Sequence, residues 1–497
     1  MAVKTGKDYI ERLKKNKPKC YILGKLEENP FEHPFFKPAI AATAMAHDAA
    51  HLPEYEELLT AKSHLTGEKI HRFTNIYQNS NEIIQKIKLN RALSHICPPC
   101  NVKCIGNDSM NAIYPTVYEI DQGAGTDYFK RFCKVVERVQ KEDLVCSAGI
   151  TDVKGDRSLR PSQQPDPDLY LRVVKRTSDG IVVRGAKAHQ TGAMVSDLTF
   201  IAPTTTLTKE DKDYAVMFVV PPYAPGITHI YGRCLGDERR LEEGGTMDLG
   251  IQDYGVHRTT LMVFDDVFIP KEHVFMDGEW EYSRPLVTYF STIHKLSSAC
   301  CKAGIFDVII GAAATIAEYK GLEKSYHIND KIATMMYLAE SIYAEAIGAA
   351  VDSFKTPAGT PMPSIMLSNV CKLTLTKHPY EMCRMMTDIA GGLFRTQPSE
   401  KDWQNPEERP MIEKYLQMKK GVPVENIMRI NRLIEYFMFG TASIEDLGHL
   451  SSGAIETSQL WIKAVGNIPY KKKLAQKLAG IKEEQVTEPK KLKVAKG

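Results

Sequence analysis

The spacing of apolar residues divides the chain into three parts. Up to about residue 145 they recur every three to four positions, as in Asn81–Leu93, which is typical of helices. Pro98 and Pro99 predict that this helix ends at Cys97, because proline disfavours helix at and just before its own position. A second helix is predicted to begin near Ser109. This first part is therefore predicted to be mainly helical.

From about Val145 to Phe275, short β-rich runs alternate with turn residues. Leu169–Val174 leads through Asp179-Gly180 into Ile181–Ala186, and Asp-Gly between two such runs is a strong hairpin signal. Three further runs have the same texture: Leu198–Ile201, Ala215–Val220 and Thr260–Phe264. This part is predicted to be a β-domain.

Past Pro285 the helical spacing returns. Four long helices are predicted, over Leu296–Lys320, Asn329–Phe354, Pro363–Met386 and Glu425–Phe439. Their Ala-, Met- and Leu-rich composition indicates a bundle buried against itself or against other subunits. The predicted fold class is α+β, with an N-terminal helical domain (1–145), a middle β-barrel or β-sandwich domain (146–275) and a C-terminal helical bundle (276–497). The bundle ends in a basic tail (483–497), which we interpret as solvated.

Composition narrows the function classes. The chain has 497 residues, of which 43% are hydrophobic and 25% charged, as in ordinary soluble proteins. Its net charge of +3 argues against a general nucleic-acid binder. The longest uncharged apolar stretch, Val308–Ala317, is far shorter than the ~20 residues that a bilayer span needs, so no transmembrane helix is expected. The N-terminus does not resemble a signal peptide, and a cytoplasmic location is expected.

Common catalytic motifs do not occur. Gly123-Ala124-Gly125 is followed by Tyr128 where a dinucleotide-binding fingerprint needs its third glycine. The sequence also has no Walker A loop and no His-Glu-x-x-His. A Rossmann dehydrogenase, a P-loop ATPase and a zincin are therefore disfavoured.

Two cysteine clusters stand out among eleven cysteines. The first, Cys97, Cys100 and Cys104, offers thiolates that bind iron–sulfur clusters, zinc or copper(I). In the second, His294 and Cys301 are two helical turns apart and can share one face. Alone, that pair is typical of a helix core, but together the two clusters indicate a composite Cys/His site. The remaining cysteines are scattered in the manner of small buried hydrophobic residues: Cys20, Cys133, Cys146, Cys234, Cys371 and Cys383.

Three polar, glycine-containing turns could meet an anionic ligand. They are Thr151–Arg157, Ala186–Gly192 and Thr387–Gly392. Such turns expose backbone N–H groups and place Lys, Arg and Thr donors nearby. Ordinary surface turns, and a helix C-cap for the third, explain them as well.

Four segments together resemble the 4-hydroxybutyryl-CoA dehydratases, and the likeness runs from Asp8 to about Ile481. The segments are TDVKGDR (Thr151–Arg157), RGAKAHQTG (Arg184–Gly192), VFDDVFIP (Val263–Pro270) and DIAGG (Asp388–Gly392). The resemblance implies an acyl-CoA dehydrogenase-like fold with FAD between the β-domain and the bundle. It also implies a CoA-thioester substrate and a homotetramer.

The resemblance implies a set of site residues. The ligands of a [4Fe–4S] cluster would be Cys100, Cys104, His294 and Cys301, which leaves Cys97 as an alternative ligand and Cys300 spare. FAD would be bound by Thr151, Asp152, Lys154, Gly155, Arg157, His189, Gln190, Thr191, Asp388, Gly391 and Gly392. Catalytic roles would fall to His294, Glu445, Lys302 and Thr191. The chain departs from the family at three places. Ser298 stands where a tyrosine is expected, and Arg258 or Thr259 stands where a glutamate is expected. Glu445, near His449, aligns with a family glutamate only across a gap.

The implied reaction is dehydration of 4-hydroxybutyryl-CoA to crotonyl-CoA, with isomerisation of vinylacetyl-CoA to the same product. The C3 hydrogen is not acidified by the thioester, and the family's proposed solution is a flavin-mediated radical with the cluster as Lewis acid. Two alternatives stay open. A flavin-dependent aromatic monooxygenase of the 4-hydroxyphenylacetate type would bind flavin but no iron. A zinc-stapled interaction protein would use Cys97, Cys100, Cys104 and His294.

Overall fold

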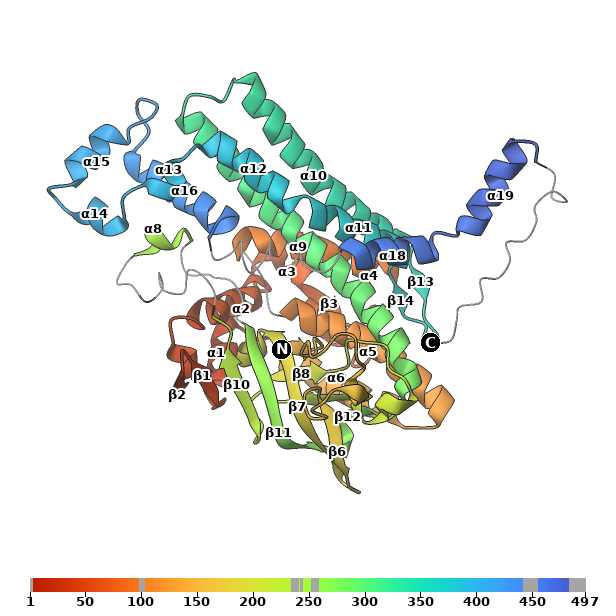
Figure 1. The fold of residues 1–497 in the computed structure, drawn as a ribbon. Coiled ribbons are helices and arrows are strands. Elements are labelled where there is room, and N and C mark those ends of the chain that lie inside the picture. The colour runs from red at the N-terminus through yellow and green to blue at the C-terminus, as the bar shows by residue number, and fades with distance from the viewer. Residues whose placement is uncertain are drawn as a thin grey trace.

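The computed structural model describes residues 3–97, 103–233, 241, 245–251, 259–440 and 455–481. Cys100, Arg258, Glu445, His449 and the basic tail 483–497 lie outside these residues. The chain is a mixture of helices and strands (Figure 1). The helices of the first part are α1 (Gly6–Leu13), α2 (Lys37–Ala49), α3 (Pro53–Leu59), α4 (Ser80–Ile96), α5 (Lys103–Ala124) and α6 (Tyr128–Glu142).

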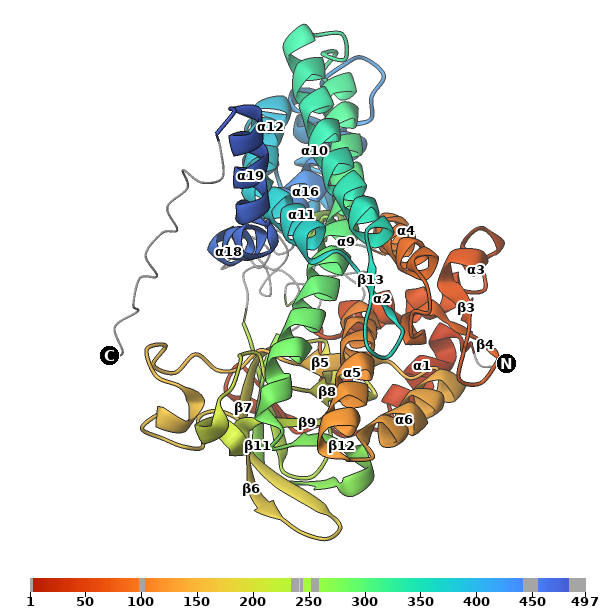
Figure 2. The ribbon, with the colours of Figure 1, turned by 90° about the vertical axis from the view of Figure 1, so that its right-hand side faces the viewer.

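The later helices follow the strands, except for the short α8 (Thr246–Leu249). They are α9 (Ser283–Tyr319), α10 (Tyr326–Val351), α11 (Ile365–Lys377), α12 (Pro379–Ala390), α13 (Leu393–Thr396), α14 (Glu400–Gln404), α15 (Arg409–Tyr415), α16 (Val424–Met438), α18 (Ile455–Val465) and α19 (Ile468–Leu478). The long helix α9 runs from the end of the molecule that holds the strands to the opposite, helical end (Figure 2). It therefore connects the two ends.

The strands form two main sheets. The larger has the order β2 (Lys25–Glu27), β1 (Cys20–Ile22), β10 (Ile227–Tyr231), β11 (Thr259–Pro270), β7 (Gly180–Thr191) and β6 (Arg172–Arg176). The smaller has the order β12 (Val274–Asp277), β9 (Val216–Val220), β8 (Leu198–Ile201) and β5 (Cys146–Gly149). Two hairpins stand apart: β3 (Thr60–Lys62) with β4 (Lys69–His71), and β13 (Phe354–Lys355) with β14 (Pro361–Met362).

The two main sheets share one apolar core, and helices cover the outer face of the smaller sheet. Val183 of β7 and Phe218 of β9 belong to the core between the sheets. On the other side, Phe132 of α6 packs with Phe200 of β8 and with Phe275 of β12. Because α5 and α6 cover this face, the start of α5 is fixed relative to the β-region.

The hairpin signal at Asp179-Gly180 is confirmed, since Arg176 of β6 pairs with Ile181 of β7. Helices predominate in the described part of residues 3–145, as predicted, and this part also contributes β1, which pairs in parallel with β10 and so extends the larger sheet. Two sequence predictions differ from the structure. The strand expected to end at Phe264 continues to Pro270. The helix expected to begin near Ser109 begins at Lys103.

The C-terminal helices also differ in their limits. α9 begins at Ser283, before Pro285, because proline is tolerated in the first turn of a helix. The helix predicted over Pro363–Met386 is two helices, which separate at His378 because Pro379 starts the second one. By length and composition α9 would pass as a membrane span, although 67% of its most apolar window is buried inside the protein. Buried core helices meet the same criterion, so this is weak evidence for a membrane.

Candidate active site at the α5–α9 junction

Three of the four predicted cluster ligands lie on α5 and α9, two helices that pack against each other. Cys104 is in the first turn of α5, and Cys301 is on α9; these residues are only 9% and 8% exposed. His294, two turns before Cys301, has a side chain that is 32% exposed. The fourth predicted ligand, Cys100, lies outside the described residues.

Two glycines allow the helices around this site to approach their neighbours closely. A Cβ atom at Gly106 of α5 would lie 2.2 Å from the carbonyl oxygen of Cys146 in β5. A Cβ atom at Gly304 of α9 would lie 2.3 Å from the carbonyl oxygen of Arg91 in α4. Any larger residue would push these elements apart. Gly106 lies two residues after Cys104, and Gly304 lies three residues after Cys301, so both contacts set the position of a predicted ligand.

Asp108, which the sequence did not single out, joins three helices at this site. Its Oδ2 atom accepts a hydrogen bond from Nδ1 of His294 (2.9 Å), and its Oδ1 atom accepts one from Oγ of Ser297 (2.7 Å). Nζ of Lys86 on α4 donates to the same Oδ1 atom at 3.4 Å. Asp108 is fully buried and lies one turn after Cys104, so it ties the cysteine-bearing turn of α5 to the ligand face of α9.

The electrostatics keep this buried pair charged. Burial raises the pKa of Asp108, but Lys86 and the hydrogen bond from His294 outweigh it and hold the pKa below its ordinary value. Lys86 is buried too. Burial lowers the pKa of this ammonium, but the charges of Tyr77, Asp108 and Cys104 together raise it above its ordinary value. A permanent cation beside Cys104 favours its thiolate form.

Further lysines surround Cys301. Nζ of Lys302 donates to Sγ of Cys301 at 3.6 Å. Burial, together with the nearby charges of Lys295 and Lys302, lowers the pKa of Lys372 to about 8. Burial alone lowers the pKa of Lys295 to about 8. The site is therefore electropositive on the side of Cys301 as well, which suits an anionic group bound by thiolates.

The residues present fit an iron–sulfur cluster. Within the described residues no three His, Cys, Asp or Glu side chains converge on a single point, as a mononuclear metal ion would require. A [4Fe–4S] cluster has no such requirement, because each of its ligands binds a different iron atom. Cys97 and Cys300 are buried thiols: burial raises the pKa of Cys97 to about 12 and that of Cys300 well above its ordinary value. Without a bound metal, both are therefore thiols rather than thiolates.

The structure brings two of the three glycine-containing turns together. The backbone oxygen of Thr151 accepts hydrogen bonds from the Ala188 amide (3.0 Å) and from Nε2 of Gln190 (3.1 Å). Asp152 forms an ion pair with Lys187 of β7. Thr191, at the end of β7, pairs with Thr259 across the sheet. Thr151–Arg157 and the end of β7 therefore line one edge of the larger sheet.

Four of the predicted FAD-binding residues are exposed on this edge: Lys154, Gly155, Arg157 and His189. Gly155 and His189 have positive φ angles of 54° and 55°. For a histidine this backbone conformation is uncommon, and His189 lies in β7 where the pairing with β11 shifts register, as at a β-bulge. An exposed edge with two cations and irregular backbone is suited to an anionic cofactor.

The third turn lies elsewhere. Asp388, Gly391 and Gly392 line a hollow of about 740 Å³ together with Lys331, Arg384 and Arg395. Asp388 forms a 2.7 Å ion pair with Lys331. Both views show α12 at the opposite end of the molecule from β7 (Figures 1 and 2). One chain therefore does not bring all the predicted FAD-binding residues together.

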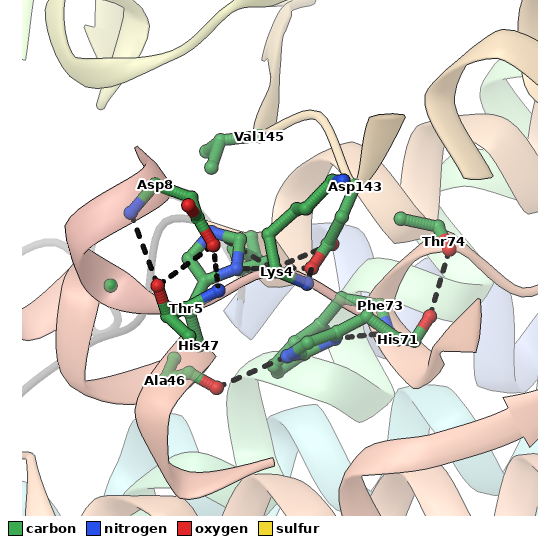
Figure 3. A network of polar contacts seen from close by, with 12 residues as sticks. Lys4, Thr5, Asp8, Ala46, His47, His71, Phe73, Thr74, Asp143 and Val145 are labelled. Atoms are coloured by element: carbon green, nitrogen blue, oxygen red, sulfur yellow. Dashed lines mark hydrogen bonds and ion pairs between the residues drawn. The ribbon is translucent and has the colours of Figure 1, made fainter. Parts of the chain in front are cut away.

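A second buried polar cluster was missed by the sequence analysis. We call His47, His71, Lys103 and Asp143 the His47 network; Figure 3 labels His47, His71 and Asp143. Asp143 accepts hydrogen bonds from Nδ1 of His47 (3.1 Å) and from Nζ of Lys103 (3.1 Å). Nε2 of His71 donates to the Ala46 oxygen at 3.1 Å. Lys103 precedes Cys104, so the network holds the start of α5 from the other side.

Comparison with known proteins places the chain in a family. Residues 5–276 match the family described as 4-hydroxyphenylacetate 3-hydroxylase N terminal, and residues 283–480 match its C-terminal counterpart. The chain is also 40% identical, over 96% of its length and 99% of the relative's, to a Clostridium aminobutyricum protein named 4-hydroxybutyryl-CoA dehydratase/vinylacetyl-CoA-Delta-isomerase. The chain belongs to the 4-hydroxybutyryl-CoA dehydratase family.

Further relatives include a second dehydratase and a monooxygenase component. The structure of an oxygen-tolerant archaeal 4-hydroxybutyryl-CoA dehydratase from N. maritimus superposes with a TM-score of 0.95. It shares 43% identity, over 98% of this chain and 97% of that one. The oxygenase component of 4-hydroxyphenylacetate 3-monooxygenase from Thermus thermophilus is 28% identical over 83% of this chain and 84% of its own length. The predicted resemblance to the dehydratases is therefore confirmed, and so is the prediction of an enzyme of the lyase class.

Proposed function

We propose that the chain converts 4-hydroxybutyryl-CoA to crotonyl-CoA and water, and also isomerises vinylacetyl-CoA to crotonyl-CoA. One observation carries this proposal. In a member of the dehydratase family, Cys104, His294 and Cys301 lie on two packed helices that Asp108 joins directly. Buried lysines beside both cysteines favour the thiolate forms that metal binding needs.

The proposed cofactors are FAD and a [4Fe–4S] cluster held by Cys100, Cys104, His294 and Cys301. When bound, the cluster would supply a Lewis-acidic iron for the C4 hydroxyl, and the flavin would supply a one-electron acceptor. Relatives of the monooxygenase type have been solved with FAD, and they share the fold with this chain at 23% identity. This fold is proposed to be acyl-CoA dehydrogenase-like.

The chain's own residues have separate proposed roles. Among the described residues, Nε2 of His294 has no hydrogen-bond partner, so it is available as a ligand or to accept a proton from the substrate. Lys302 holds positive charge beside Cys301. Thr191 lies at the exposed end of β7, where its hydroxyl would reach the flavin ring. Glu445, outside the described residues, is the proposed second acid or base.

The proposed assembly is a homotetramer. Helix α12, which carries Asp388 and is followed by Gly391 and Gly392, lies at the opposite end of the molecule from β7, which ends at Thr191 (Figure 1). A partner subunit would therefore supply these three residues if they bind the same flavin. The cysteines of the described part of the chain form no disulfide, which is in keeping with the proposed cytoplasmic location.

The test is a product assay on anaerobically purified protein. Crotonyl-CoA formed from 4-hydroxybutyryl-CoA, without consumption of an electron acceptor, would support the proposal. The competing activity is hydroxylation of 4-hydroxyphenylacetate with reduced flavin and oxygen, which the family description and the Thermus thermophilus relative favour. Hydroxylation without crotonyl-CoA formation would replace the dehydratase proposal by the monooxygenase one.

A further inference from the structure

Asp108 controls which nitrogen of His294 carries the proton. A carboxylate can only accept hydrogen bonds, and the other oxygen of Asp108 accepts from Lys86 and from Ser297. Its contact with Nδ1 of His294 (2.9 Å) therefore requires a proton on Nδ1. In the neutral ring, the lone pair is then on Nε2, which is the atom without a partner among the described residues.

The same contact fixes the direction of the ring. His294 also stacks on Phe290, with ring centroids 5.3 Å apart and an angle of 15° between the planes. Asp108 cannot turn away, because Ser297 and Lys86 hold its other oxygen. Two neighbours thus hold the imidazole, Asp108 at Nδ1 and Phe290 at one ring face, and neither of them occupies Nε2.

We propose that Asp108 is the positioning residue for His294: it holds the imidazole in the tautomer and direction that present Nε2 to the iron–sulfur cluster. The inference rests on the proposed function, since it assumes that His294 is a ligand. Carboxylates that orient metal-binding histidines commonly contribute ~10–100-fold to metal affinity or activity. A purely structural role, as half of the Lys86–Asp108 ion pair, is the competing explanation.

The test replaces the carboxylate without changing its size. In Asp108→Asn the amide no longer forces a proton onto Nδ1, so His294 should be released from iron in most of the protein. The readout is the imidazole nitrogen coupling in pulsed EPR spectra of the reduced cluster. A second readout is the rate at which a chelator removes iron, which we expect to rise ~10–100-fold.

Two variants separate this effect from loss of structure. Ser297→Ala removes a hydrogen bond from the same carboxylate but leaves the contact with His294, so it should keep the nitrogen coupling. The double variant Lys86→Met/Asp108→Asn leaves no unpaired buried ammonium. It should bind flavin as the wild type does and still lose the coupling, even if Asp108→Asn alone fails to fold.

The outcomes are distinguishable. If the wild type contains no iron, the cluster and this inference both fail. Suppose instead that the wild type shows the nitrogen coupling. If every Asp108 variant that folds retains this coupling and loses iron as slowly as Ser297→Ala does, only this inference is overturned. Loss of the coupling in a folded, flavin-binding Asp108 variant supports it.

Discussion

Two buried clusters in this protein combine a carboxylate, a histidine and a lysine, and they differ in whether the histidine is enclosed. In the His47 network the His47 ring is fully buried, and Nζ of Lys103 lies 3.2 Å from both ring nitrogens. At the α5–α9 junction, His294 meets Asp108 through Nδ1 only, and its side chain is 32% exposed. The two clusters are made of the same chemical groups.

A histidine nitrogen without a partner distinguishes a functional cluster from a structural one. In the His47 network His71 also uses both nitrogens, because Nδ1 accepts from the Phe73 amide and Nε2 donates to Ala46. Such a cluster has no atom left for a ligand and can only hold its elements together. His294 keeps one nitrogen for a ligand, and this spare atom is what marks the α5–α9 junction as a site.

The largest expected effect is on turnover. His294→Ala should lower the rate of crotonyl-CoA formation by ~10²–10⁴-fold or more, because it removes both a ligand and the proposed base. His47→Gln is the matched control, and it should retain turnover per folded chain because His47 only holds structure. Normal turnover by His294→Ala in the same assay would sink the assigned role.

The next effect is on stability. Asp143→Ala leaves the buried ammonium of Lys103 without its carboxylate, and breaking such a pair costs ~3–5 kcal/mol. We expect a clear drop in the thermal unfolding midpoint, while the protein that stays folded keeps the nitrogen coupling of His294. An unchanged midpoint would show that the network is not the structural anchor described here.

A smaller effect follows from pH. Burial lowers the pKa of His47 and puts that of His71 well below its ordinary value, so the folded protein binds these protons less readily than the unfolded chain does. The unfolded chain gains these protons below pH ~6.5. Stability is therefore complete above that pH and falls as the pH drops below it, by at most about 1.4 kcal/mol per pH unit for each histidine. The thermal midpoint measured from pH 7 to 5 should fall, and less steeply in His71→Asn.

The smallest effect concerns the spare thiol. Cys97→Ala should leave the iron content unchanged, because its buried thiol donates to the Leu93 carbonyl instead of serving as a thiolate. Cys104→Ala should lose most of the iron. Equal loss of iron from both variants would make Cys97 a ligand and shift the site toward the end of α4.

The sequence predicted local features better than contacts between distant residues. The hairpin at Asp179-Gly180 and the shared face of His294 and Cys301 follow from short-range spacing, and the structure contains both. Asp108 could not be found this way, because it lies 186 residues from His294 and only the packing of α5 on α9 joins them. The strand β1 is just three residues long, and its pairing with β10 gives it its structure.

Some missed features did have a local signal. Pro379 predicts the break between α11 and α12, since the residue before a proline is a frequent helix boundary. The meeting of Thr151–Arg157 with the end of β7 had no such signal, because it depends on the β7 register. Spacing along the chain likewise gives no signal that α12, which carries Asp388, lies far from that edge (Figure 1).

The α5–α9 junction is proposed to hold an iron–sulfur cluster. The most direct test of this claim is the iron, acid-labile sulfide and flavin content of anaerobically purified protein, recorded together with the visible spectrum. We expect about four iron atoms, about four sulfides and about one FAD per chain. Flavin without iron, or zinc without flavin, would contradict the claim.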